Sequence, residues 1–395
     1  MNFFKYFFFI WCLVAAIHAV PVESPVSAQA AGDRYVVVMK QGISRAAADL
    51  PVFKDKGVKK VTIGDFQAVT GKFDPESLKT VKSNPMVQFV EKDVVYSASW
   101  VQKNAPWGLA RITQREKLAA GAERQYFYDP KGGEGITAYV MDSGVNIHHQ
   151  EFEGRASVGV TYFDYDLDDL GHGTHVAGII GGKTYGVAKK VKIVSVKVLD
   201  KNGNGYLSTI LAGIEWVNRN ARKGRSVVNM SLGGPRSDAL NQAVEAAIAN
   251  NTIIVAAAGN SNVDTCGFSP ASGKGVISVA ATDINDRRAS YSNFGSQCTS
   301  LFAPGSQITS AYIGSNTAVR DASGTSMASP HVAGGVAVIL AREGLLTPYG
   351  ALQSLRKKAT RNAIADAKGT PNLLLYVKNP LADILPINRT PVHGA

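Results

Sequence analysis

The chain has 395 residues, of which 45% are hydrophobic, and carries a formal net charge of +11 at pH 7. This length predicts one large domain and one small one, with enough apolar residues to bury a sizeable core. The positive charge is scattered in short clusters, which is typical of a solvated surface. It lacks the clustered pattern of a protein that reads nucleic-acid bases, so no nucleic-acid partner is expected.

The N-terminus has the pattern of a secretory signal peptide, residues 1–19. Lys5 supplies the positive charge, residues 7–16 form a short apolar run, and the small residue Ala19 ends the segment. The alternative is a membrane anchor, but the run is shorter than the roughly 18 apolar residues that a membrane-spanning helix needs. We therefore expect a secreted protein, extracellular or vacuolar, with no membrane association after cleavage and a linker at residues 20–33.

Residues 34–99 are expected to form a small domain of their own. Asp74 followed by Pro75 is typical of a helix start, with an N-cap and then proline in the first helical position. The order of strands and helices, βαββαβ, predicts an α+β ferredoxin-like fold. The strands are expected at residues 35–40, 58–63, 66–73 and 87–91, the helices at residues 44–56 and 75–83, and a linker without periodicity at residues 93–104.

Residues 100–377 alternate short β-branched runs with helical segments. Continuous apolar runs suit parallel strands that are buried on both faces. The fold class expected is therefore α/β, with a doubly wound, mostly parallel sheet and helices on both faces. Residues 378–395 contain three prolines and are interpreted as a tail. The strands are expected at residues 136–141, 191–199, 226–230, 252–257 and 276–280, and helices at residues 172–180, 206–219 and 237–249.

Three polar residues lie where this pattern places one edge of the sheet. Asp142 ends a predicted strand, His172 opens a helix, and Ser326 opens a long apolar helix. Open α/β sheets bind ligands outside the carboxyl ends of their strands, so all three are expected at the same edge. A serine nucleophile needs a histidine to take its proton and a carboxylate to orient that histidine. The three residues are therefore candidates for a catalytic triad.

Asn260 is a candidate fourth member of the site. It follows the predicted strand at residues 252–257. Its side-chain amide, together with the backbone N–H of Ser326, would supply the donors of an oxyanion hole. Taken alone, the pair Gly259-Asn260 is more typical of a turn. Beside the other three residues, we favour the oxyanion hole.

Five segments in order resemble the motifs of the subtilisin-like serine proteases, and most closely those of the proteinase K group. The resemblance covers residues 34–377, and the order Asp, His, Ser is that of subtilisin. It implies a monomeric serine endopeptidase that cleaves proteins and peptides through an acyl-enzyme. The segments are Asp142-Ser-Gly, His172-Gly-Thr-His-Val-Ala-Gly, Ser231-Leu-Gly-Gly, Ala257-Ala-Gly-Asn260 and Gly324-Thr-Ser326-Met-Ala-Ser-Pro.

The resemblance also implies that residues 34–99 are an inhibitory propeptide, so that the enzyme is made as a zymogen. Such a domain assists folding and is removed autocatalytically, here between residues 96 and 100. The cleaved propeptide then inhibits the enzyme until the propeptide is degraded. The enzyme's own propeptide is therefore an expected binding partner. The alternative is a permanent N-terminal domain.

In the family, an extended peptide substrate adds as a strand between two glycine-rich segments. A pocket with small walls is wide and apolar, so we expect broad specificity with a preference for aromatic or large aliphatic residues. No acidic cluster marks a pocket for basic residues, which argues against a kexin-like processing enzyme. The matching residues are Gly203, Asn204 and Gly205, Ser231, Leu232 and Gly233, with Ala257, Ala258 and Gly259 lining the primary pocket.

Three cysteines are present, and Cys12 is removed with the signal peptide. The remaining pair, Cys266 and Cys298, would lie in an oxidising compartment, so a disulfide is expected. The alternative is two free buried thiols. The pair also resembles one bridge of the aqualysin-like bacterial members of the family.

No cofactor is expected for catalysis, and structural calcium is left as an alternative. The strong calcium site of the proteinase K group uses backbone carbonyls near Lys274 and Val276 and an Asp carboxylate, but the matching position here is Thr299 or Ser300. A hard cation prefers a carboxylate, which argues against this site. The spacing from His172 to His175 lacks the glutamate and the i, i+4 pattern of zinc peptidases, so no zinc site is expected.

Two other classes of protein share parts of this pattern. An α/β-hydrolase esterase requires Gly-x-Ser-x-Gly and the order Ser, Asp, His, whereas Ser326 comes last and is followed by Met327 and Ala328. A catalytically inactive binding protein would have lost a triad residue, and none is substituted here. The pattern favours a serine endopeptidase over both.

Overall fold

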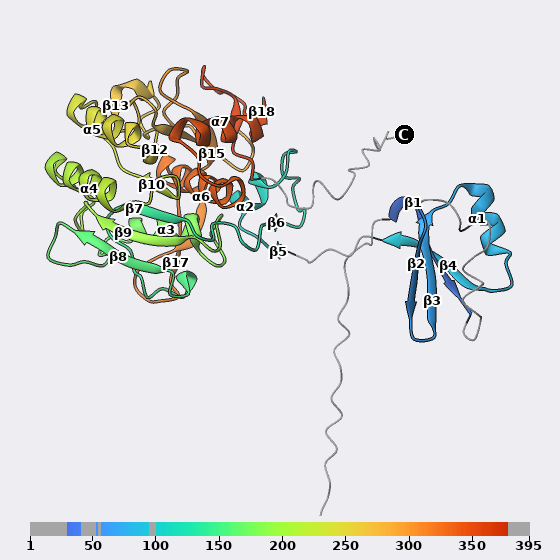
Figure 1. Ribbon diagram of the computed structural model, residues 1–395. Helices are drawn as coiled ribbons and strands as arrows, with labels where there is room; N and C mark the ends of the chain where they lie inside the picture. Colours follow the sequence, from blue (N-terminus) through green and yellow to red (C-terminus); the bar gives the residue numbers. More distant parts are fainter. Residues whose placement is uncertain (1–29, 41–52, 54–56, 95–99, 378–395) are drawn as a thin grey trace, which may run out of the picture. The chain divides into compact units, whose positions relative to one another are not determined.

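The computed structural model describes residues 30–40, 53, 57–94 and 100–377. The chain divides into two compact units, Met1–Ala98 and Ser99–Ala395 (Figure 1). The predicted signal peptide, the tail at residues 378–395 and, apart from Phe53, the predicted helix at residues 44–56 lie outside the described residues. Most of the predicted cleavage segment also lies outside them, because residues 95–99 are not described.

The first unit contains a four-stranded antiparallel sheet with the order β2-β3-β1-β4. Its strands are β1 (Ala30–Met39), β2 (Lys59–Ile63), β3 (Phe66–Lys72) and β4 (Val87–Val94). Helix α1 (Pro75–Lys82) begins as predicted, because the Asp74 side chain caps it by accepting from the Ser77 N–H at 2.9 Å. This strand order agrees with the ferredoxin-like prediction. β1 begins at Ala30, so the linker predicted at residues 20–33 extends too far.

The second unit is built on a nine-stranded sheet with the order β18-β19-β15-β14-β12-β10-β7-β9-β8 (Figure 1). All neighbouring strands are parallel except β18 and β19. The predicted strands of this unit are all present, to within about two residues at each end. The strands are β7 (Thr137–Asp142), β8 (Ala156–Thr161), β9 (Lys192–Lys197), β10 (Ser226–Met230), β12 (Ile253–Ala257), β14 (Ile277–Thr282), β15 (Leu301–Pro304), β18 (Thr360–Arg361) and β19 (Leu373–Leu374).

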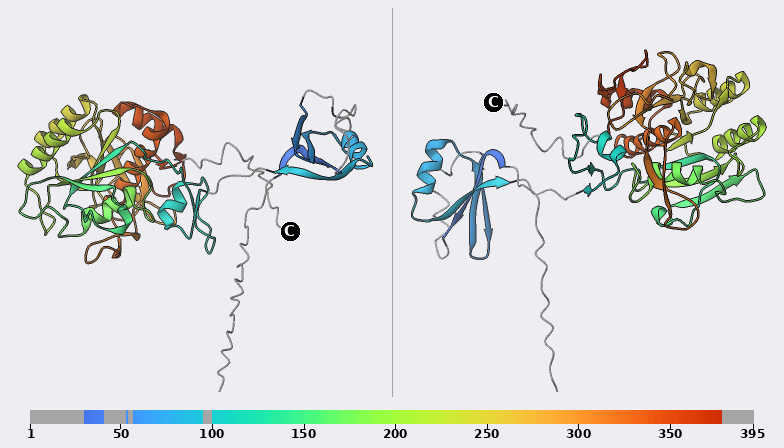
Figure 2. Two further views of the ribbon diagram at one scale, coloured as in Figure 1. Left: turned by 60° about the horizontal axis from the view of Figure 1, so that its bottom comes forward. Right: turned by 180° about the vertical axis from the view of Figure 1, so that it is seen from behind.

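Helices cover both faces of this sheet, which confirms the predicted doubly wound α/β fold (Figure 2). Helices α3 (His172–Gly181) and α6 (Thr325–Glu343) share one apolar core with α2 (Trp107–Ile112) and α7 (Pro348–Lys358). Helices α4 (Leu207–Asn220) and α5 (Asp238–Ala249) belong to the other core. Successive residues of β7 show the reason: Val140 enters the first core and Met141 the second, because strand side chains alternate between faces.

The linker predicted at residues 93–104 is wrong at both ends. β4 continues to Val94, and Val101–Lys103 forms β5, which pairs in antiparallel fashion with β6 (Gln125–Phe127). A strand this short cannot show a period of two in the sequence, and only its distant partner makes it a strand. The other short elements are β11 (Gly234–Pro235), β13 (Phe268–Ser269), β16 (Ile308–Ala311), β17 (Val319–Ala322), η3 (Gln150–Phe152) and η4 (Thr265–Gly267).

The strand order places a crevice at the carboxyl end of β7. From β7 the chain adds β8 and β9 on one side of this strand, and then crosses over to add β10, β12, β14 and β15 on the other. Connections therefore leave in opposite directions beside β7, and open α/β sheets bind ligands at such a point. Asp142 is the last residue of β7. Among the described residues, no helix is both long and apolar enough to cross a membrane.

Candidate active site

Asp142 and His172 meet at this crevice. The Asp142 side chain is 0% exposed, and its Oδ1 lies 2.7 Å from Nδ1 of His172, the first residue of α3. The N–H of Ser143 donates to the same oxygen at 2.8 Å. The His172 side chain keeps 29% of its surface exposed. The ring is thus anchored through Nδ1, which leaves Nε2 for exchange of a proton.

Burial and two nearby carboxylates together set the pKa of His172. Burial of the ring by itself would lower this pKa, but the Asp142 carboxylate, the hydrogen bond to it and the nearby charge of Asp168 outweigh burial. The net result is a pKa of His172 above its ordinary value of 6.5. A higher pKa makes the imidazole a stronger base, and it also extends the protonated form to higher pH.

Ser326 is the second residue of α6 and lines the same cleft as His172. Its hydroxyl donates to the Ser231 carbonyl at 3.1 Å, and the Ser231 hydroxyl donates to the Ser326 carbonyl at 2.8 Å. In the part of the chain that the structure describes, no hydrogen bond joins Ser326 to His172. Because Ser326 lies in the first turn of α6, its own N–H has no acceptor within the helix.

The side-chain amide of Asn260 is held in one orientation by Thr325. Its Oδ1 accepts from the N–H and from the hydroxyl of Thr325, both at 2.9 Å. The Thr325 hydroxyl has one proton to donate, and because it accepts from the Gly259 N–H at 3.1 Å, that proton points to Asn260. Oδ1 is therefore occupied, and Nδ2 is the group that can donate into the cleft. Sequence reasoning does not single out Thr325, although it stands between Gly324 and Ser326 in the motif.

The cleft has a volume of about 650 Å³ and is lined by His172, Ser326 and Asn260. It also contains nearly all the predicted substrate-binding residues: Gly203, Asn204, Gly205, Ser231, Leu232, Gly233, Ala257 and Gly259. Apolar side chains from outside the motifs complete the lining, among them Leu170, Leu207, Ile210, Leu240 and Phe268. The sequence gives no signal for these residues beyond their ordinary apolar character.

Ala258 does not line the cleft, which differs from the expectation for the primary pocket. Its side chain is buried, its N–H donates to the Val279 carbonyl at 3.0 Å, and its carbonyl accepts from the Asn293 side chain at 3.0 Å. Ala257 and Gly259 line the cleft, whereas the side chain of Ala258 between them is buried away from it.

Residues 133–374 match the Subtilase family. The chain belongs to this family. It is 40% identical over 392 residues to Subtilisin-like protease 2 of Pseudogymnoascus destructans, which covers 93% of this chain and 96% of that protein. It is also 40% identical over 392 residues to Alkaline protease 1 of Aspergillus clavatus, with 92% of this chain and 96% of that protein covered.

A solved structure agrees with the family. The crystal structure of a cold-adapted subtilisin-like serine proteinase is 48% identical in sequence and has a TM-score of 0.66, covering 69% of this chain and 98% of that protein. The fold, the family and the names of the relatives together make this subtilase a serine endopeptidase that acts on protein substrates.

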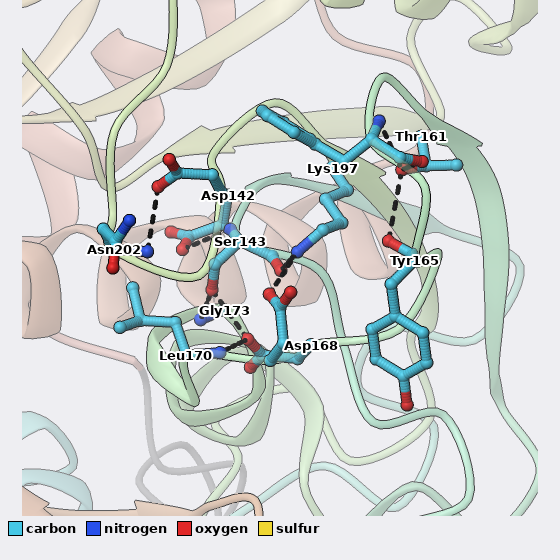
Figure 3. Close-up of polar contacts among 12 residues, drawn as sticks. Asp142, Ser143, Thr161, Tyr165, Asp168, Leu170, Gly173, Lys197 and Asn202 are labelled. Atoms are coloured by element: carbon cyan, nitrogen blue, oxygen red, sulfur yellow. Dashed lines mark hydrogen bonds and ion pairs between the residues drawn. The ribbon is translucent and has the colours of Figure 1, made fainter.

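A second carboxylate of the subtilase, Asp168, ties together the segments that carry Asp142 and His172 (Figure 3). It accepts from the Ser143 hydroxyl, from the Gly171 N–H and from the Thr174 N–H, each at 2.8 Å. The Ser143 hydroxyl in turn accepts from the Gly173 N–H at 3.0 Å. Asp168 therefore caps the first turn of α3 and joins it to the residue after Asp142. It lies outside the recognised motifs, so sequence reasoning misses it.

The predicted disulfide is present in the subtilase. Cys266 and Cys298 are bonded, with their Cα atoms 5.2 Å apart. Cys266 lies in η4, and Phe268, which lines the cleft, follows two residues later. The bond thereby restrains one wall of the cleft, and closing a loop of 32 residues stabilises the fold by about 3–4 kcal/mol on the chain-entropy model.

The residues at the position that matches the family's strong calcium site do not fit that ion. The Thr299 hydroxyl donates to Thr265 Oγ1 at 2.8 Å, and the Ser300 hydroxyl accepts from the Ser278 N–H at 3.3 Å. Neither offers the charged oxygen that calcium prefers. The described residues also contain no group of three or more His, Cys, Asp or Glu side chains that could hold a metal ion.

His175 is held by the β16–β17 hairpin through one ring nitrogen. Its Nε2 lies 3.0 Å from the Ile308 carbonyl and 2.9 Å from the Arg320 carbonyl, so the ring is committed to the β16–β17 hairpin. Burial lowers the pKa of His175 to about 4, which keeps this ring neutral near pH 7.

Proposed function

We propose that this subtilase cleaves peptide bonds with Asp142, His172 and Ser326 as its catalytic triad. The observation that carries the proposal is the 2.7 Å contact between Asp142 Oδ1 and His172 Nδ1 at a cleft that Ser326 also lines. A change of the Ser326 rotamer, away from the Ser231 carbonyl, would present its hydroxyl to Nε2 of His172. Catalytic hydrogen bonds of this kind often form fully only when substrate is bound.

The proposed reaction proceeds in two halves. His172 takes the proton of Ser326 as the hydroxyl oxygen attacks the substrate carbonyl, and then gives that proton to the leaving amine. Water attacks the resulting acyl-enzyme, again with His172 as the base, and Ser326 is released. Asp142 keeps the proton on Nδ1 and stabilises the imidazolium without being protonated itself.

Asn260 and the Ser326 N–H would form the oxyanion hole. Thr325 occupies Oδ1 of Asn260, which leaves Nδ2 as the donor, and the Ser326 N–H lacks an acceptor within α6. Donors that are already oriented need no reorganisation when negative charge develops on the substrate oxygen. Asn260 and Ser326 both line the cleft in which that oxygen would be formed.

The lining of the cleft supports broad specificity for aromatic or large aliphatic residues. Ala257 and Gly259 leave room for a large side chain, and Leu240 and Phe268 offer apolar walls against which it can be buried. The described residues that line the cleft include no Asp or Glu, so no charge there selects basic side chains. The substrate backbone would pair with residues 203–205 and 231–233.

Residues 34–99 would act as an inhibitory propeptide in a secreted zymogen. The described residues before Ala98 form a compact unit with its own sheet. The fungal relatives match almost the whole chain, whereas the solved proteinase covers only 69% of it, close to the share taken by residues 100–377. This difference in coverage supports removal of the N-terminal unit from the active enzyme.

The proposal is tested with the variant Ser326→Ala in the full-length chain. Without the nucleophile, casein hydrolysis should vanish and the propeptide should stay attached, as measured by casein assay and by the mass of the secreted protein. Ser290→Ala, an exposed serine outside the cleft, is the matched control and should behave as wild type. A purified Ser326→Ala protein that matured unaided and cleaved casein would exclude Ser326 as the nucleophile.

A further inference from the structure

Lys197 is a charged side chain buried inside the protein next to the catalytic carboxylate. It is the last residue of β9, pairs in register with Asp142 of β7, and its side chain is 0% exposed. Removing an ammonium group from water is costly unless the group is paired, so fully buried lysines are rare. A buried lysine at this position is therefore expected to make contacts that an apolar side chain of the same size could not make.

The ammonium group joins two segments that are distant in the sequence. Its Nζ donates to the Ser143 carbonyl at 2.5 Å and to Asp169 Oδ1 at 2.6 Å. Ser143 directly follows Asp142, and Asp169 lies in the turn that leads into His172. Figure 3 shows the Lys197 side chain extending from its strand toward Ser143 and the turn that carries Asp168.

Ser143 transmits this contact to the catalytic pair. Its N–H donates to Asp142 Oδ1, the same oxygen that contacts His172, while its hydroxyl donates to Asp168 and its carbonyl accepts from Lys197. The three polar groups of Ser143 are therefore all committed. The Ser143 carbonyl and N–H belong to adjacent peptide units that meet at the Ser143 Cα, so a shift of the carbonyl would act through this Cα on the donor that positions Asp142 Oδ1.

We propose that Lys197 is a positioning residue. Together with Asp169, it holds Ser143 and the turn before His172 in the positions at which Asp142 contacts His172. This inference rests on the proposed roles of Asp142 and His172. Lys197 touches neither the substrate nor the reacting atoms, and it acts through Ser143.

A structural ion pair is the competing explanation, and the energetics of burial separate the two. The Lys197 side chain is 0% exposed and the Asp169 side chain is 30% exposed. Removing Asp169 alone leaves a buried charge without its partner and is strongly destabilising, whereas replacing both charged groups by uncharged residues of similar volume often leaves stability unchanged or raises it. If the pair served stability alone, an uncharged pair would serve as well. The geometry gives it a second task, because the Lys197 ammonium reaches from β9 to both Ser143 and Asp169.

The experiment uses three variants of the full-length chain: Lys197→Met, Asp169→Asn and the double variant with both changes. Lys192→Met, which removes an exposed lysine at the start of the same strand, is the matched control. Stability is measured as the melting temperature. Catalysis is measured as kcat/KM on a peptide substrate and as the rate of inactivation by phenylmethylsulfonyl fluoride, which reports the reactivity of Ser326 with little dependence on peptide binding.

The double variant decides the question, because it removes both charges and so leaves no unpaired ion. We expect its melting temperature to return close to wild type, while kcat/KM and the inactivation rate both fall at least tenfold. The downfield proton signal of the His172 Nδ1–H in the NMR spectrum should shift or broaden, since it reports the contact with Asp142. A double variant that does not mature although its melting temperature is unchanged counts as a loss of activity.

Wild-type rates in a double variant with wild-type stability would overturn the inference and leave Lys197 and Asp169 as a structural pair. That result would not affect the proposed triad, which stands or falls with Ser326→Ala. Loss of activity in the Lys192→Met control would also overturn the inference, because it would show that removing any lysine of this strand impairs the enzyme.

Discussion

The two halves of the cleft are held in place by different kinds of contact. Around Asp142 and His172 the supporting groups are charged: Asp168 holds Ser143 and the start of α3, and Lys197 pairs with Asp169. Around Ser326 they are neutral. The Ser231 hydroxyl donates to the Ser326 carbonyl at 2.8 Å, and Thr325 holds Asn260 through two hydrogen bonds.

This difference matches the role proposed for each half. A general base needs a tuned pKa, and nearby charges are the strongest means of tuning it. The nucleophile and the oxyanion donors need only orientation, which neutral hydrogen bonds supply without adding a field that would shift the pKa of His172. Changes in the charged half should therefore alter both the rate and its pH dependence, whereas changes in the neutral half should alter the rate alone.

The largest effect within the charged half is expected for Asp142→Asn. The amide keeps the shape of the side chain, but it cannot stabilise the imidazolium and favours the wrong tautomer of His172. We expect kcat to fall about 10⁴-fold, on the scale known for removing the carboxylate of a serine-protease triad. Steady-state kinetics on titrated active sites measure this, and a loss of less than about tenfold would contradict the role of Asp142.

Asn260→Ala should have the largest effect within the neutral half, after loss of Ser326 itself. Removing one oxyanion donor is expected to lower kcat about 10²–10³-fold, with little change in KM, because the donor acts mainly on the transition state. The shape of the pH profile should be unchanged, since no charge is removed. A pH profile shifted along the pH axis would contradict the inference that changes in the neutral half alter the rate alone.

Thr325→Val should have a smaller effect of the same kind. The variant keeps the backbone N–H that donates to Asn260 Oδ1, but it loses the hydroxyl, which donates to the same oxygen and accepts from the Gly259 N–H at 3.1 Å. Loss of the hydrogen bond to Asn260, of about 1 kcal/mol, predicts a fall in kcat of roughly fivefold to tenfold. Thr325→Ser keeps the hydroxyl and should restore most of the rate; if both variants are equally impaired, the contact with Asn260 is not the cause.

Asp168→Asn should show its clearest effect in the pH profile. The pKa of His172 lies above 6.5, so the active neutral imidazole is lost as pH falls through a midpoint above 6.5. The Asp168 charge is one of the groups that raise this pKa, and its removal should move the acid limb of kcat/KM to lower pH.

Asp166→Asn is the control for this experiment, because Asp166 is an exposed carboxylate on the same segment. Its acid limb should coincide with that of wild type. An acid limb of Asp168→Asn that stayed in place or moved to higher pH would show that Asp168 acts on His172 only by capping α3, without a contribution from its charge.

The candidate residues of the site were predicted from the sequence, but the residues that support them were not. Asp142, His172 and Ser326 lie in short contiguous motifs at the ends of strands and the starts of helices, where local pattern is informative. Lys197 and Ser143 are 54 residues apart, and nothing near either residue indicates the other. Ala258 shows the same limit on a smaller scale, because only the path of the chain after β12 decides that it faces away from the cleft.

The sequence by itself determined the α/β class, the strands of the large sheet, the candidate triad and the pairing of Cys266 with Cys298. Those features depend on local apolar periodicity, on contiguous motifs and on a count of cysteines, all of which are properties of short segments. The tertiary structure alone decided the strand β5, the apolar lining of the cleft and the charged support around Ser143. Each of these features arises when segments that are distant in the sequence meet, so that a buried charge or backbone group gains a hydrogen-bond partner. The free energy of those contacts is gained only in the folded chain.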